Sequence, residues 1–108
     1  MSAERHNIGK LRWDLVDWSS VEEMLKVLEF GAIKYSADNW KKGLNKKEIL
    51  ESTQRHLISL FQDETKDPES QLHHAGHIMC NMLFYLYHDR NKSFVTERNN
   101  PFNKQQTN

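Results

Sequence analysis

Cysteine is almost absent from this sequence, and so are the long apolar runs typical of membrane proteins. Cys80 is the single cysteine among 108 residues, so the chain cannot form an internal disulfide. No stretch resembles a signal peptide or reaches the roughly 18 apolar residues of a membrane-spanning helix. We therefore expect a protein of the reducing cytoplasm that has no membrane partner.

An excess of charge of one sign is also missing. Lysine and arginine together number 15, as do aspartate and glutamate, and no basic block stands apart. Proteins that bind bulk nucleic acid are steered by a positive field that this sequence does not supply. The composition therefore argues against bulk nucleic acid as a partner.

Alternation of β-branched and polar residues, which is typical of strands, is nowhere sustained. We expect an all-α fold, a small bundle of three to five helices that oligomerises through its helices. The 108 residues suffice for one domain with a modest core. We place this domain at residues 9–90, between a flexible N-terminus, 1–8, and a polar C-terminal tail, 91–108.

Capping signals predict where the first two helices begin. Ser19 with Glu22, or Ser20 with Glu23, forms a capping box before an apolar stripe that runs through "VEEMLKVLEFGAIKYSA". Gly31 costs about 1 kcal/mol within this helix, which indicates a point of close packing. A second helix is expected to start near Asn45, with Glu48 as its box partner.

The third helix is expected to follow "KDPES", with Asp67 as its cap and Pro68 in its first turn. From Ile78 to Tyr87 this helix is apolar on almost every side. Such a helix is enclosed by its neighbours or lies in a subunit interface.

Histidines and one amide share a face of that third helix. At about 100° per residue, His74, His77, Asn81 and His88 fall within a wedge of roughly 60°. His56 is expected at the edge of the buried face of the second helix. These groups can satisfy one another and nearby backbone. Alternatively, they form a site, because imidazoles from two helices can bind a transition metal or phosphate oxygens.

Two of the carboxylates in the loop between the second and third helices are candidate metal ligands. Glu64 and Asp67 could supply oxygen ligands to Mg²⁺ or Mn²⁺. The ordinary alternative for acidic residues at this position is helix capping and a solvated surface.

Cations and aromatic residues flank the first helix. Upstream, "GKLRWDLV" places Lys10, Arg12 and Asp14 around Trp13, which suits phosphate contacts and base stacking, or simple packing of Trp13 on the bundle. Downstream, an aromatic pair flanks an amide and could hold a nucleobase or form a packed turn. The downstream residues are Lys34, Tyr35, Asn39 and Trp40.

Together, the segments "GKLRWDL", "EEMLKVLEFGAIKY", "NWKKG", "RHL", "DPES" and the His74, His77, Asn81 pattern resemble a known family. This family comprises the small phage and bacterial dATP/dGTP diphosphohydrolases, grouped with the all-α MazG-like nucleotide pyrophosphohydrolases. The resemblance implies a helical bundle, a homo-oligomer (dimer or tetramer) and nucleotide sites between helices. The matching positions are Lys10, Arg12, Asp14, Glu22, Gly31, Lys34, Tyr35, Asn39, Trp40, Gly43, Arg55, His56, Glu64, Asp67, His74, His77 and Asn81.

The resemblance implies a metal-dependent enzyme that splits a purine deoxynucleoside triphosphate into monophosphate and pyrophosphate, with Mg²⁺ or Mn²⁺ as cofactor. The expected catalytic residues are His56, His77 and Glu64, and the expected metal ligands are Glu22, Glu64, Asp67 and His77. The expected nucleotide-binding residues are Lys10, Arg12, Trp13, Asp14, Lys34, Tyr35, Asn39, Trp40, Arg55, His74 and Asn81.

The sequence departs from the superfamily in its metal-binding carboxylates. The superfamily binds metal through Glu-x-x-Glu and Glu-x-x-Asp, whereas this chain has Glu51-x-x-Gln54 and His74-x-x-His77. One alternative is therefore a catalytically silent protein that needs no metal and sequesters a signalling nucleotide, for example to counter host antiphage immunity. Another is a scaffold protein that dimerises through its third helix.

Overall fold

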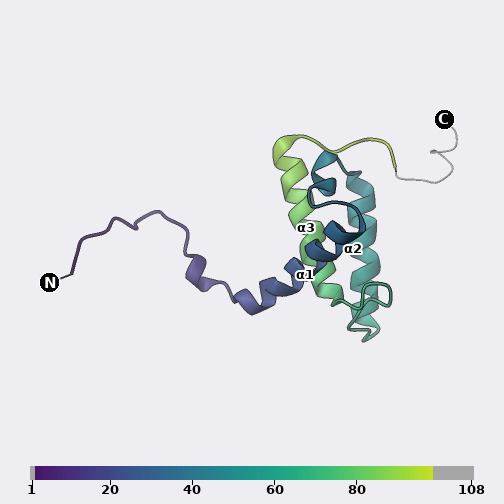
Figure 1. The fold of residues 1–108 in the computed structure, drawn as a ribbon, viewed down its shortest axis with the longest axis horizontal. Coiled ribbons are helices and arrows are strands. Elements are labelled where there is room, and N and C mark those ends of the chain that lie inside the picture. The colour runs from purple at the N-terminus through teal and green to yellow at the C-terminus, as the bar shows by residue number, and fades with distance from the viewer. Residues whose placement is uncertain (1, 99–108) are drawn as a thin grey trace.

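Three α-helices form the body of the protein in a computed structural model that describes residues 2–98 (Figure 1). The described residues contain two isolated β-bridges and no longer strand, so the expected all-α bundle is confirmed. Within the described part, no helix is both long and apolar enough to cross a bilayer. The elements are η1 (Trp13–Leu15), α1 (Trp18–Lys34), η2 (Asn39–Lys42), α2 (Lys46–Phe61) and α3 (His74–Asn91).

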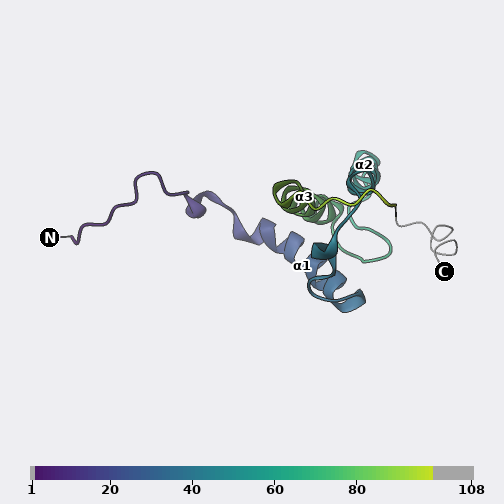
Figure 2. The ribbon, with the colours of Figure 1, turned by 90° about the horizontal axis from the view of Figure 1, so that it is seen from above.

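The helix α3 is the centre of the bundle, because it packs against both α1 and α2 and also contacts η2. Figure 1 shows α2 and α3 side by side, and Figure 2, from above, shows both nearly end-on with α1 beside them. Residues 2–17 run away from the bundle in both views as an extended N-terminal arm. The first turns of α1 continue this arm before the helix reaches α3.

The start of α2 is as predicted, and the start of α1 is not. Asn45 caps α2, since its Oδ1 accepts a hydrogen bond from the Glu48 N–H at 3.0 Å. At α1, Asp17 occupies the cap position, and no side chain bonds to the first-turn backbone. The predicted serine capping boxes are wrong because the Ser19 and Ser20 hydroxyls donate to the Asp17 carboxylate instead.

The third helix begins later than predicted. Its cap is His73, whose Nδ1 accepts from the Ala75 N–H at 2.9 Å. Asp67 caps only a turn, because its Oδ2 accepts from the N–H groups of Glu69 and Ser70. Residues 64–73 therefore form a loop that folds back over the start of α3.

A glycine lets α1 and α3 approach closely, and it is Gly76 rather than Gly31. A Cβ at Gly76 would lie 2.7 Å from the backbone oxygen of Glu23 on α1. A Cβ at Gly31 would meet nothing within 4 Å, so the predicted close packing at that residue is wrong. The crossing of α1 over α3 therefore requires a residue without a side chain at position 76.

The segment that follows α3 returns to α2. Val95 forms a bridge with Asn45, and the Asn45 side chain donates to the carbonyl oxygen of Thr96. Arg98 pairs with both carboxylate oxygens of Glu51. Residues 92–98 thus lie against the start of α2, and the rest of the predicted tail is outside the described residues.

The apolar core of the described chain is small. Val27, Ile49 and Cys80 are its buried apolar residues, one from each helix. Burial raises the pKa of the Cys80 thiol to about 12. His74 and His88 are buried as deeply as these residues, so part of the interior is polar.

Candidate functional site

A cleft of about 640 Å³ opens between the C-terminal half of α1, α2, the 64–73 loop and the first turns of α3. Most of the predicted site residues meet here, although they come from every helix. The predicted residues that line the cleft are Lys34, Tyr35, Asn39, Trp40, Arg55, His56, Glu64, Asp67, His74, His77 and Asn81.

The N-terminal arm lies outside this cleft. Arg12 donates two hydrogen bonds to Asp14 on the exposed arm, at 2.8 and 2.7 Å, and these bonds lower the pKa of that carboxyl group. Trp13 stacks on Trp18 with ring centroids 6.2 Å apart. The predicted residues that do not line the cleft are Lys10, Arg12, Trp13, Asp14 and Glu22.

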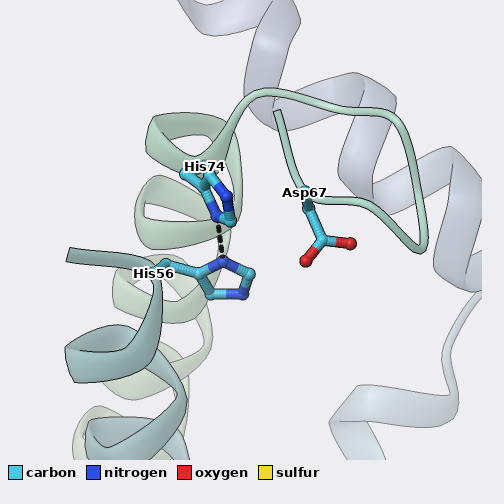
Figure 3. Close-up of side chains that lie close together, drawn as sticks. All are labelled: His56, Asp67 and His74. Carbon is cyan, nitrogen blue, oxygen red and sulfur yellow. Dashed lines mark hydrogen bonds between the residues drawn. The ribbon is translucent and has the colours of Figure 1, made fainter. Parts of the chain in front are cut away.

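Two histidines from different helices touch inside the cleft (Figure 3). The Nδ1 atoms of His56 on α2 and His74 on α3 lie 2.7 Å apart. His74 also contacts the Glu64 Oε1 through its Nε2, again at 2.7 Å. The His74 side chain is 3% exposed, so its two ring nitrogens are held between one carboxylate and one imidazole.

Asp67 faces this histidine pair from the loop, as Figure 3 shows. One candidate ligand atom from each of Asp67, His56 and His74 lies within 4.8 Å of the other two. Partial burial raises the pKa of Asp67, but the hydrogen bonds from Ser70 and the nearby histidines together lower it by more than burial raises it. The net direction is downward, and Asp67 is therefore an anion at neutral pH.

A third histidine completes the cluster. His77 stacks on His56 almost in parallel, with ring centroids 4.5 Å apart and planes 6° from parallel. Its Nε2 lies 2.7 Å from the Ser70 Oγ. The pKa of His77 is lowered, first because burial disfavours the charged ring. The pKa of His56 is lowered by burial and then by the neighbouring His77 and His74.

Two serines belong to the site but were missed by the sequence analysis. Ser70 bonds to His77, and Ser52 accepts a hydrogen bond from the Asn81 Nδ2 at 3.2 Å. Ser52 precedes His56 by one helical turn, and this spacing could have placed it on the same face of α2. The position of Ser70 depends on the fold of the loop, for which the sequence carries no periodic signal.

Of the two aromatic residues that the sequence predicted for the cleft, one is packed and one is exposed. Trp40 packs against Phe84 and Tyr87 with ring centroids 4.8 and 4.9 Å apart, as the packed-turn alternative predicts. Tyr35 is 65% exposed, and the Lys34 ammonium lies 5.4 Å from its ring centroid. Tyr35 is therefore the aromatic face of the cleft that is open to a ligand.

Lys34 also pairs with Glu69 across the cleft, at 2.9 Å from nitrogen to oxygen. This ion pair is exposed and joins α1 to the loop. It raises the pKa of Lys34, chiefly through the hydrogen bond that Lys34 donates to Glu69. A phosphate group entering the cleft would compete with the Glu69 carboxylate for this ammonium.

His88 does not contribute to the cleft, although it shares a face of α3 with His74. Its Nε2 donates to the carbonyl oxygen of Trp40 at 2.7 Å, and its Nδ1 lies 2.6 Å from the Ser93 Oγ. His88 therefore fits the alternative that these polar groups bond to nearby protein groups and form no site. It joins η2 to the end of α3.

Sequence comparisons relate this chain to known proteins. A family model described as dATP/dGTP diphosphohydrolase, N-terminal, matches residues 2–98. A dATP/dGTP diphosphohydrolase of Salmonella phage PMBT28 is 31% identical over 98 residues, which cover 91% of this chain but only 33% of the relative. No solved structure gives a significant match. Because the family model covers all of the described residues, the chain belongs to the family of the dATP/dGTP diphosphohydrolase N-terminal domain.

Proposed function

We propose that the cleft binds a purine deoxynucleoside triphosphate and hydrolyses it to the monophosphate and pyrophosphate with the help of a divalent metal. The observation that carries this proposal is the cluster of three histidines and two carboxylates on the wall of a cleft of about 640 Å³. A cleft of this volume is in the range that holds small ligands and cofactors. The name of the phage relative supports the choice of substrate.

The described side chains supply a base and cations for this reaction. His77 is half-buried, and its lowered pKa keeps it neutral, as a general base requires. Water attacks the α-phosphorus, its proton passes to His77, and the bond to the bridging oxygen breaks to release pyrophosphate. Lys34 and Arg55 line the same cleft and would stabilise the phosphate charge.

The donor atoms also fit a divalent metal. Two imidazoles and a carboxylate converge within 4.8 Å, and Glu64 adds a second carboxylate beside them. A metal at this cluster would neutralise phosphate charge and acidify bound water. The outer wall of the cleft, with Tyr35, is the surface on which we place the purine ring, because stacking needs an exposed aromatic face.

The test is product analysis of the full chain incubated with dATP, dGTP and the other common triphosphates, with Mn²⁺ or with EDTA. We expect Mn²⁺-dependent formation of dAMP or dGMP with an equal amount of pyrophosphate. His77→Gln should reduce the rate by about 100-fold or more. His6→Gln, the same change on the exposed arm, is the matched control and should retain the wild-type rate.

A second function is favoured by one specific observation. The MazG-like superfamily that the sequence resembles binds metals through Glu-x-x-Glu and Glu-x-x-Asp, whereas this chain has Glu51-x-x-Gln54 and His74-x-x-His77, with one carboxylate in place of four. A protein that only sequesters a nucleotide would need the cleft and its cations but no such cage. If an intact nucleotide is recovered from the denatured protein, and no product forms with any of the metals tested, the function is sequestration and not hydrolysis.

A further inference from the structure

One hydrogen lies between the Nδ1 atoms of His56 and His74, and the contact of His74 with Glu64 decides which ring carries it. Nδ1 atoms 2.7 Å apart can share only one hydrogen, since two would collide and none would leave two lone pairs in repulsion. If His74 is neutral, its Nε2–H donates to Glu64, and the shared hydrogen comes from His56. If His74 is charged, it donates from both nitrogens. In both states one proton lies between two imidazoles from different helices.

We propose that this proton marks a binding site for one late first-row transition metal ion, such as Zn²⁺ or Co²⁺, with His56, His74 and Asp67 as ligands. This inference deepens the proposed function, on which its catalytic meaning rests, but ion binding itself requires no nucleotide. It gives His56 the role of a metal ligand instead of a base. It also leaves His77, which lies outside this set of three, free to act on water.

The two imidazoles need only a small adjustment to accept the ion. Zinc–imidazole bonds are about 2.0–2.1 Å long, so two imidazole nitrogens in a tetrahedral shell lie about 3.3 Å apart. The two Nδ1 atoms must therefore separate by about 0.6 Å from their 2.7 Å contact. His56 is only half-buried and can rotate by this amount, whereas His74 is fixed between α3 and Glu64.

The donor set selects the metal. Two imidazoles and one carboxylate suit Zn²⁺, Co²⁺, Fe²⁺ or Mn²⁺, whereas Mg²⁺ prefers an octahedral shell of oxygens. Three protein ligands leave at least one position for water or a phosphate oxygen, as in catalytic rather than structural zinc sites. The position of the cluster on the cleft wall makes that open position accessible to a ligand.

Glu64 has the contact expected of a positioning residue. Imidazoles that bind metals commonly donate their other N–H to a carboxylate, which fixes the tautomer and the direction of the ring. Glu64 lies 2.7 Å from the His74 Nε2, which leaves the His74 Nδ1 lone pair to point at His56 once the metal has displaced the shared proton. The side chain of Glu64 is 47% exposed, so its neutral amide variant is expected to leave the fold intact.

The experiment is calorimetric titration of the EDTA-treated full chain with Zn²⁺, Co²⁺ and Mg²⁺, together with the visible absorption spectrum of the Co²⁺ form. We expect one Zn²⁺ or Co²⁺ per chain, no comparable Mg²⁺ binding, and the intense absorption of low-coordinate cobalt. His56→Gln and Asp67→Asn should each weaken Zn²⁺ binding by more than about 100-fold, and Glu64→Gln by about 10- to 100-fold.

Matched controls separate the ligands from their surroundings. Glu69→Gln removes a carboxylate of the same loop, and His6→Gln removes an imidazole of the exposed arm; both should keep wild-type affinity. Circular dichroism of each variant verifies folding. Unchanged Zn²⁺ affinity in both His56→Gln and Asp67→Asn, or equal affinity for Mg²⁺, would overturn the site in favour of a Glu64–His74–His56 hydrogen-bonded chain. Zn²⁺ binding without any hydrolysis would retain the site and reject only the proposed function.

Discussion

His88 is completely buried near the C-terminal end of α3, and both of its ring nitrogens have partners inside the protein. The Trp40 carbonyl oxygen can only accept, so the His88 Nε2 carries a hydrogen. The ring also contacts Trp40, Tyr87 and Phe94, with centroids 5.1 to 6.3 Å away. Its contacts are those of a structural residue that joins η2, α3 and the segment after α3.

We predict that His88→Ala lowers the free energy of unfolding by about 2–4 kcal/mol, because it leaves a cavity and a carbonyl group without its donor. Urea denaturation followed by circular dichroism measures this change. Zn²⁺ affinity of the folded variant should equal that of the wild type, since His88 lies outside the cleft. Asp89→Ala, an exposed neighbour, is the control and should change stability by less than about 0.5 kcal/mol. A similarly small change in His88→Ala would contradict the structural role.

At the scale of residues, the sequence predicted the histidines of the site better than their partners. His56 and His74 could be found because each lies at a defined angle on a regular helix. The partners Glu64 and Ser70 are in a loop, and their contacts with histidines require the chain to fold back over α3. No spacing along the sequence encodes that return, and the same spacing could not separate His88 from His74.

At the scale of elements, the crossing of α1 over α3 depends on Gly76. A Cβ there would lie 2.7 Å from the oxygen and 3.0 Å from the carbon of the Glu23 carbonyl group, which is backbone and cannot rotate away. We predict that Gly76→Ala destabilises the fold by about 1–3 kcal/mol through overpacking. Gly31→Ala meets nothing within 4 Å and should stabilise α1 by up to about 1 kcal/mol.

The measurement for both glycine variants is the urea midpoint at constant slope, because a change of slope would report altered compactness instead. The two variants are matched, since each adds one methyl group inside a helix. Shifts of the same sign for both would show that helix propensity, and not the contact with Glu23, dominates at Gly76.

Helix starts show why the sequence predicts some elements and not others. The Asn45 cap is local, because donor and acceptor are three residues apart, and the sequence predicts it correctly. Asp67 offered an equally good local signal for a helix cap, but hydrogen bonds within the loop keep this segment out of the helix. The N–H of Asp67 donates to Leu72, and that of His74 donates to Thr65. These non-local bonds delay α3 until His74, and no capping rule includes them.

At the scale of the whole molecule, much apolar surface remains uncovered in the single chain. Along the arm and the first turn of α1, Leu11, Trp13, Leu15 and Trp18 are between 51% and 80% exposed. One face of α2 adds a second apolar surface, made of Leu50, Leu57, Ile58 and Phe61. Small monomers with so few buried apolar residues are marginally stable, and large exposed apolar patches are typical of interfaces.

This surface supports the prediction from the sequence that the protein is a homo-oligomer, a dimer or tetramer, and two double variants test it. Light scattering during size-exclusion chromatography should give a multiple of the 12.9 kDa chain mass for the wild type. Replacing Trp13 and Leu15 by serine, or Ile58 and Phe61 by serine, should shift the species towards the single-chain mass if that surface is the interface. Such variants expose less apolar area as monomers than the wild-type chain would, so dissociation need not cause aggregation.

Exposed polar residues of α1 provide the control for these variants. Lys26 and Glu29 are exposed, and replacing both by serine should leave the measured mass unchanged. The pair that causes dissociation also identifies which surface associates, because the arm leaves the bundle on the side opposite to α2 (Figure 1). A wild-type protein that elutes at the single-chain mass over a wide range of concentrations would disprove the predicted oligomer. The apolar surface of the arm would then remain open to solvent, since stacking Trp13 on Trp18 still leaves both residues more than half exposed.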